Sequence, residues 1–129
     1  MTDLHLSRRA MAAGVRPKRG AVWVDTETDA SVLLLEQTRL GRWRCWEYGE
    51  HEGLRHCDSD KMRPDLDDPG TRGHLLEQVR ERLGDPFAYC GPVVTETAWK
   101  VWSWTVPGGE VASGPTEKAA IVAALEAGK

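Results

Sequence analysis

The chain has 129 residues, of which 40% are hydrophobic, and a formal net charge of −3. This length fits one domain or two small subdomains that share a core, and the weak negative charge gives no general attraction to nucleic acid or membranes. No apolar run approaches the roughly 18 residues that a membrane span needs, and the first residues lack the apolar core of a secretory signal. We therefore expect a cytoplasmic protein without membrane contact.

Residues 1–19 are expected to form a basic arm. Apolar residues up to Met11 favour a short helix, which Gly14 and Pro17 would end. The positive charge of the arm is compatible with two interpretations, a solvated tail or a segment that contacts phosphates. The side chains relevant to the second interpretation are Arg16, Lys18 and Arg19.

Residues 20–64 contain several short stretches with the composition of β-strands. Polar or glycine-containing turns such as Asp25–Ala30 and Gly49–Gly53 separate these stretches. Four or five short strands with turns between them predict a small β-barrel. The predicted strands are Ala21–Val24, Ser31–Gln37, Arg42–Tyr48 and Leu54–Asp58, and a single helical turn is expected before Pro64.

Residues 65–129 are predicted to form a helix–sheet–helix subdomain. Asp68 is a helix N-cap followed by proline at the first helical position, and the helix that it opens runs to about Leu83. An alanine-rich closing helix is capped by Thr116 and is able to lie close against a sheet. The strands expected between the two helices are Val93–Thr95, Ala98–Val106 and Glu110–Ser113.

Two parts of the sequence resemble short accessory proteins of phages that infect GC-rich bacteria. The first part opens with a basic-Gly-x-Val-Trp-x-Asp pattern, Arg19 to Asp25, and closes with Lys61 to Pro64, as in small SH3-like or KOW-like barrels. The second part is the helix, tryptophan-bearing strand and closing helix that follow Pro64. The resemblance implies an α+β fold, in which an SH3-like small β-barrel in the N-terminal half packs with an α-β-β(-β)-α unit in the C-terminal half. It also implies a mobile-element setting, and it carries no catalytic residues.

The chemically reactive side chains form no recognisable catalytic motif, so we expect neither an enzyme nor a cofactor. No glycine-rich phosphate loop is present, and no cysteine sits in a nucleophile elbow. The three cysteines are expected to be thiols in a reducing compartment. One cluster contains residue types that bind zinc, but two of its members, His56 and Cys57, are adjacent in the sequence. Adjacent residues of a strand point to opposite faces, so this spacing is poor for a single zinc site. That cluster is Cys45, His51, His56 and Cys57, and the alternative is two small core cysteines with exposed histidines.

A basic and aromatic ribbon within residues 42–48 is the candidate nucleic-acid interface. Alternation places Arg44, Trp46 and Tyr48 on one side, with Arg42 nearby. Such a surface can stack bases and hold phosphates, and the arm residues would extend it. Neighbouring glutamates, including Glu47 and Glu50, nearly cancel the local charge.

Three tryptophans occur within the stretch AWKVWSWTV, residues 98–106. In a strand, Trp102 and Trp104 share the more apolar face, which we expect the two helices to cover. Trp99 and Val101 would then remain on the opposite face. Two interpretations follow, a stretch buried on both faces or an open strip that binds a partner. The partner-binding residues of the second interpretation are Trp99, Val101 and Trp46.

These observations favour a non-enzymatic protein of a phage or other mobile element that binds a host macromolecule. Inhibition of a host defence system is the concrete version of this hypothesis. A nucleic-acid-binding small barrel is the alternative. The partner is expected to be a host protein, with nucleic acid and a second copy of the chain as the other candidates.

Overall fold

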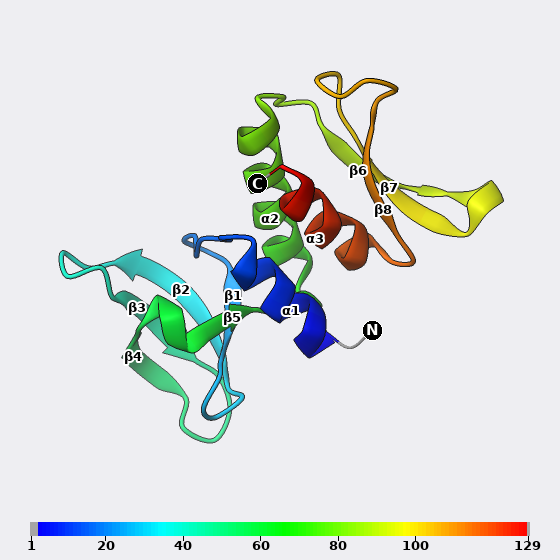
Figure 1. The fold of residues 1–129 in the computed structure, drawn as a ribbon. Helices are drawn as coiled ribbons and strands as arrows, with labels where there is room; N and C mark the ends of the chain where they lie inside the picture. The colour runs from blue at the N-terminus through cyan, green and yellow to red at the C-terminus, as the bar shows by residue number, and fades with distance from the viewer. Residues whose placement is uncertain (1–2, 129) are drawn as a thin grey trace. The chain divides into compact units, whose positions relative to one another are not determined.

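The computed structural model describes residues 3–128, which form two compact units. One unit is Arg16–Thr71, and the other combines the chain before Arg16 with the chain after Thr71. These boundaries differ from the predicted ones, 1–19, 20–64 and 65–129, because residues Asp3–Ala12 form a helix that packs on the helix Glu117–Ala127. Three α-helices and two antiparallel sheets within the described residues confirm the α+β class (Figure 1).

The unit Arg16–Thr71 contains one five-stranded antiparallel sheet with the strand order β4-β3-β2-β1-β5. The two end strands are not hydrogen-bonded to each other, so this sheet is open and the predicted closed barrel is not formed. A single 3-10 turn stands where one helical turn was expected, between the fourth and fifth strands. The elements are β1 (Val22–Asp25), β2 (Ser31–Gln37), β3 (Trp43–Glu47), β4 (Gly53–Cys57), η1 (Ser59–Lys61) and β5 (Met62–Pro64).

One face of this sheet carries the core of the unit. Exposed or half-buried residues alternate with buried ones along β1 and β2, as the period of a strand requires. Trp23 is the largest side chain of this core and lies opposite Val32 in the register of β1 and β2. The two ends of the unit are tied together, because the Thr71 hydroxyl accepts a hydrogen bond from the Val22 N–H at 2.8 Å.

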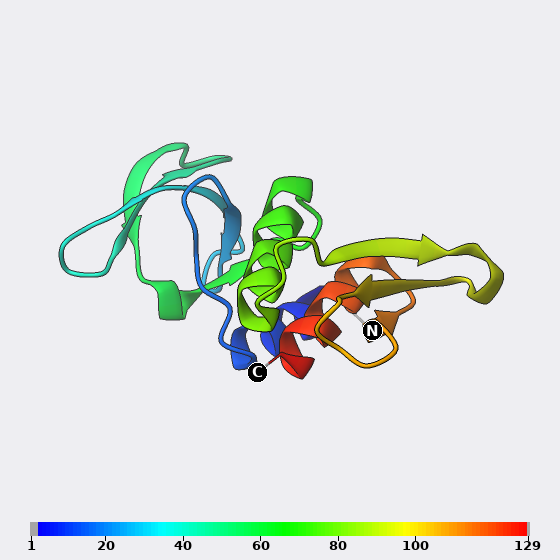
Figure 2. The ribbon, with the colours of Figure 1, turned by 90° about the horizontal axis from the view of Figure 1, so that it is seen from above.

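The other unit is built around the three-stranded antiparallel sheet β6-β7-β8. Helix α3 packs along this sheet and also contacts α1 (Figures 1 and 2). Arg9 of α1 forms an ion pair with Glu126 of α3. The predicted arm is therefore largely a docked helix, with Leu6 and Ala10 buried. The elements are α1 (Asp3–Ala12), α2 (Pro69–Leu83), β6 (Tyr89–Val93), η2 (Val94–Glu96), β7 (Ala98–Trp102), β8 (Glu110–Gly114) and α3 (Glu117–Ala127).

Both predicted helix caps are confirmed. The Asp68 carboxylate accepts a hydrogen bond from the Thr71 N–H at 2.8 Å, and the Thr116 hydroxyl accepts one from the Ala119 N–H at 3.2 Å. The alanines of α3 allow its backbone to approach the sheet closely. At Gly114 on β8, an added Cβ would come within 2.8 Å of the Ala120 nitrogen, so only glycine fits there.

Candidate functional site

The sheet β6-β7-β8 has one covered face and one open face. Trp102 lies on the open face, whereas the sequence predicts it on the covered face. Val101 is completely buried under α3, so its neighbour Trp102 points to the open face. The prediction that the face of Trp102 and Trp104 is the covered one is therefore wrong. The reason is steric: Cys90, Val101 and Ala112 are directly opposite one another across the three strands, and such small side chains leave room for a close helix.

Four aromatic side chains gather beside the open face, and we call them the aromatic patch: Phe87, Tyr89, Trp102 and Trp104. Tyr89 is the cross-strand partner of Trp102, whereas Phe87 and Trp104 come from the loops that flank these strands. Trp104 is 90% exposed, Phe87 77% and Tyr89 55%. Together with Ser103 and Gly109 they line an open pocket of about 210 Å³.

A single carboxylate holds the two loops of the aromatic patch. Asp85 accepts hydrogen bonds from the Phe87 N–H at 2.9 Å, the Ser103 hydroxyl at 2.9 Å and the Trp104 N–H at 3.1 Å. The Phe87 N–H is the largest cause of a lowered Asp85 pKa, and it outweighs the opposing effect of burial. Asp85 is only 5% exposed, so this bonded carboxylate holds the backbone at Phe87 and Trp104 from within the unit.

Sequence reasoning missed Asp85 and its role. The available signal was the pair Asp85-Pro86 directly after the helix-ending Gly84, because an aspartate there readily bonds the backbone N–H two residues later. The bond to Ser103 bridges 18 residues and has no local signal.

An ion cluster borders the aromatic patch on the same open face. The Lys100 ammonium lies 2.8 Å from a Glu96 carboxylate oxygen and 2.6 Å from a Glu110 oxygen. It also lies 5.7 Å from the centre of the Trp102 ring. The hydrogen bond to Glu110 is the largest cause of a raised Lys100 pKa, so the lysine remains charged and paired.

The partner-binding residues predicted from the sequence are not brought together. Val101 is buried and inaccessible to a partner, so its assignment to a contact surface is wrong. Trp99 lies on the covered side of β7 and is half-buried. Trp46 belongs to the other unit, where it lies between Leu33 and Leu54 in the register of β2, β3 and β4.

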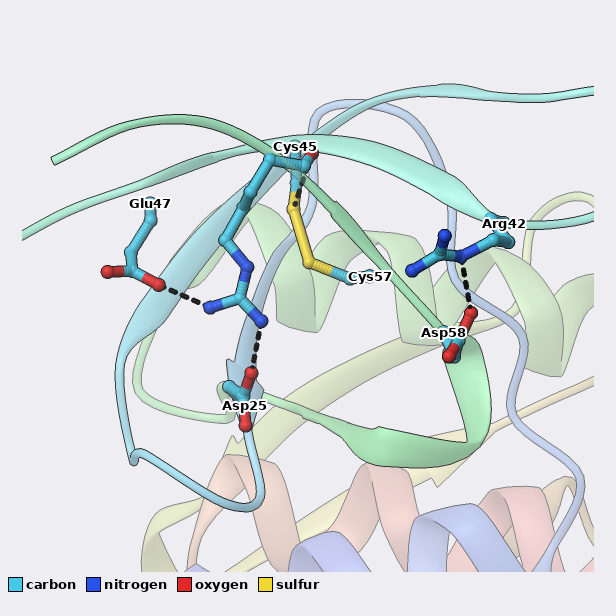
Figure 3. The surroundings of a disulfide bond; sticks show 7 residues. Asp25, Arg42, Cys45, Glu47, Cys57 and Asp58 are labelled. Carbon is cyan, nitrogen blue, oxygen red and sulfur yellow. Dashed lines mark hydrogen bonds and ion pairs between the residues drawn. A yellow bond between two sulfur atoms is a disulfide. The ribbon is translucent and has the colours of Figure 1, made fainter. Parts of the chain in front are cut away.

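The predicted nucleic-acid surface keeps its alternation but carries paired charges. Arg44 and Tyr48 are exposed and Trp46 is half-buried. Arg44 pairs with Glu36 at 3.2 Å. Arg42 pairs with Asp58 at 2.7 Å (Figure 3). Residues 16–71, which include Arg16, Lys18 and Arg19, contain nine Lys/Arg and twelve Asp/Glu. This unit therefore has no excess of positive charge to attract phosphates.

Cys45 and Cys57 form a disulfide between β3 and β4, which corrects the expectation that they are thiols (Figure 3). Both are buried, as expected of core cysteines. In the register, Cys45 is opposite Arg55 and Cys57 is opposite Trp43, so the bond runs diagonally across the two strands. Residues 3–128 contain no group of three or more His, Cys, Asp or Glu that could hold a metal ion.

Thiol titration of the protein denatured without a reductant should find one reactive cysteine. Titration after denaturation and reduction should find three. The single thiol is Cys90, which is half-buried on the covered face of the sheet. Burial raises the Cys90 pKa to about 11, so it should react slowly at neutral pH before denaturation. Cys90→Ala is the control and should remove the signal of the non-reduced protein. Three thiols without a reductant would contradict the disulfide.

The chain matches no protein-family model, no curated protein and no solved structure. None of the helices between residues 3 and 128 is both long and apolar enough to cross a membrane. The aromatic patch is the candidate functional site, because contiguous apolar surface on a folded protein commonly marks an interaction site.

Proposed function

We propose that this chain is a non-enzymatic binding protein that docks on a partner protein through the aromatic patch. The observation that carries the proposal is the exposure of Phe87, Tyr89 and Trp104 beside one pocket, in loops that Asp85 holds in place. A patch of this kind resembles the centre of an interface, where tryptophan and tyrosine contribute most of the binding free energy.

The energetic argument rests on apolar area. An aromatic side chain that is covered by a partner loses about 150–250 Å² of accessible surface, and about 25 cal/mol is gained per Å² of apolar surface removed from water. For Trp104 alone this is a gain of several kcal/mol that the isolated chain leaves unrealised. Because hydrogen bonds to Asp85 already hold the backbone of Phe87 and Trp104, little backbone entropy is lost on docking.

The setting that we propose is a phage or other mobile element, with a host protein as the partner and inhibition of a host defence system as the outcome. The support comes from the sequence resemblance described above. We propose that the unit Arg16–Thr71 is the SH3-like part of the protein, in the form of an open sheet.

Nucleic-acid binding through Arg42, Arg44, Trp46 and Tyr48 is the weaker alternative. The ion pairs of both arginines and the net negative charge of residues 16–71 oppose it. Phosphate-driven binding would fall steeply as the salt concentration rises, whereas docking on an apolar patch would not.

Replacing Trp104 by alanine is expected to weaken partner binding about 30-fold or more, as for an interface hot spot. The tagged protein would capture its partner from the lysate of a GC-rich bacterium treated with nuclease, and affinities would then be measured with the purified partner. Trp104→Ala should leave the fold intact, because the side chain is 90% exposed. Val94→Ala is the matched control, since Val94 is 87% exposed in the same unit but outside the patch.

Unchanged affinity of Trp104→Ala would overturn the proposed docking surface. A signal that disappears with nuclease and with Arg44→Ala/Trp46→Ala would instead support the nucleic-acid alternative.

A further inference from the structure

We infer that the pocket of the aromatic patch takes an arginine side chain from the partner. This inference rests on the proposed function, because it assigns a ligand chemistry to the same surface. Four aromatic rings line the pocket, and only Ser103 and Gly109 complete its lining. Its volume of about 210 Å³ leaves room for one long side chain. The pocket is thus a receptor for one group rather than a flat interface.

The ring faces are the first argument for a cation. The face of an aromatic ring carries negative potential and attracts cations positioned over it. Trp102 already shows this preference within the molecule, because the Lys100 ammonium lies 5.7 Å from its ring centre. A cation inside the pocket would lie among four aromatic side chains, those of Phe87, Tyr89, Trp102 and Trp104.

The charge of Asp85 is the second argument. Its carboxylate lies directly behind the pocket wall, since all three of its hydrogen-bond donors belong to the lining residues Phe87, Ser103 and Trp104. These donors are neutral, and within the described residues no lysine or arginine forms an ion pair with Asp85. A nearly buried negative charge is thus held mainly by these dipoles, with a smaller contribution from the Arg80 guanidinium, and its field extends into the pocket.

The border of the patch adds further negative charge. Two carboxylates, Glu96 and Glu110, share the one ammonium of Lys100. Glu110 is also the cross-strand neighbour of Trp102, so it lies beside the pocket. The guanidinium of Arg80, which also acts on Asp85, is itself paired with Glu77. The local charge is therefore complementary to a cationic partner residue.

The pocket favours a guanidinium over an ammonium. An ammonium is a compact, strongly hydrated charge that needs acceptors to replace its water, and this lining offers few: the Ser103 hydroxyl is already bonded to Asp85 and Thr105. A guanidinium is planar, weakly hydrated and stacks on aromatic faces. Arginine is therefore the side chain that the lining accommodates best.

The test is a titration of the full chain with blocked pentapeptides Gly-Ser-Xaa-Ser-Gly, in which Xaa is arginine, citrulline, lysine or leucine. Citrulline keeps the shape of arginine and lacks its charge. Binding is followed by the indole N–H signals of the tryptophans in two-dimensional NMR spectra. We expect the arginine peptide to shift the Trp102 and Trp104 signals and to bind about fivefold more tightly than the citrulline peptide.

Two variants test which carboxylate attracts the arginine side chain of the peptide. Glu110→Gln should weaken arginine-peptide binding about twofold without affecting the fold, because Glu110 is on the surface. Asp85→Asn should weaken it more, and unchanged signals of the other tryptophans would show that the fold persists. Glu117→Gln, at the start of α3, removes a charge from the same unit and should have no effect.

Equal binding of the citrulline or leucine peptide, or no shift with any peptide, would overturn the cation inference. Equal binding of the lysine peptide would overturn the assignment to arginine. The proposed function fails on a separate result, an unchanged affinity of Trp104→Ala for the captured partner, so the two failures are distinguishable.

Discussion

Replacing Arg55 by methionine is expected to destabilise the unit Arg16–Thr71 by about 3 kcal/mol or more. The Arg55 guanidinium bonds both the Asp25 carboxylate and the Glu47 carboxylate (Figure 3). The carboxylate side chains are only 8% and 10% exposed, respectively. Without the cation, two nearly buried negative charges would face each other with no compensation, and this cost exceeds the value of the lost hydrogen bonds.

Urea unfolding followed by circular dichroism would measure the effect of Arg55→Met. Arg63→Met is the matched control, because Arg63 pairs with an Asp29 side chain that is 79% exposed, and such surface pairs contribute about 1 kcal/mol or less. A similar loss in both variants would contradict the special role of Arg55. Arg55→Met/Glu47→Gln should recover part of the loss, because it removes one of the two uncompensated charges.

The pH dependence of stability provides a second measurement on the same cluster. Burial raises the Asp25 pKa, but hydrogen bonds from the Glu27 N–H, Arg55 and the Thr28 N–H outweigh it, and the net pKa is lowered. A lowered pKa means that Asp25 stabilises the fold above its unfolded value of about 3.9 and that this contribution is lost as the pH falls through the folded value. Arg55→Met should reduce this acid sensitivity.

Replacing Gly114 by alanine should destabilise the other unit by about 3 kcal/mol, at the upper end of overpacking costs. The added Cβ would lie 2.8 Å from the Ala120 nitrogen and 2.9 Å from the Ala119 Cβ. Two of the three atoms nearest to it belong to the backbone of α3, so no side-chain rotation relieves the contact. Helix α3 must move away from β8, which opens the core around Ile121 and Leu125.

Thermal unfolding would report the effect of Gly114→Ala, with Gly91→Ala as the control. Gly91 lies in the same sheet, and a Cβ there would be 3.7 Å from the Tyr89 ring, an ordinary contact distance. The control should change the stability by less than about 1 kcal/mol, and in the stabilising direction if reduced backbone freedom of the unfolded chain dominates. Equal melting temperatures for the two variants would contradict the close packing of α3 on β8.

Local sequence signals predicted much of the fold. The strand Ser31–Gln37 is confirmed as β2, and the caps Asp68 and Thr116 are confirmed. Such signals act over a few residues, so they are readable without knowledge of the tertiary structure. The long strand predicted for Ala98–Val106 ends instead at Trp102, because the Ser103 hydroxyl bonds Asp85 and its N–H bonds the Gly109 carbonyl.

The features that the sequence did not predict depend on which strands are neighbours. The prediction for β7 used the hydrophobicity of Trp102 to choose the covered face. The covered face is instead the one on which small side chains surround Val101, and only the strand register reveals these neighbours. The pairing of Cys45 with Cys57 likewise requires the register of β3 and β4. The aromatic patch could be anticipated only in part, since the bond that holds Trp104 comes from Asp85, 19 residues earlier in the sequence.

The division of the chain into a continuous unit and a discontinuous one has a consequence for synthesis on the ribosome. Residues 16–71 leave the ribosome as one stretch, and their two ends meet at Val22 and Thr71, so this segment can complete its sheet early. Helix α1 is synthesised before this segment, but its partner α3 is synthesised after it, since the pair Arg9–Glu126 spans 117 positions. Leu6 and Ala10 thus stay uncovered until α3 is released, so α1 is exposed to chaperones and proteases for longer than the strands of residues 16–71.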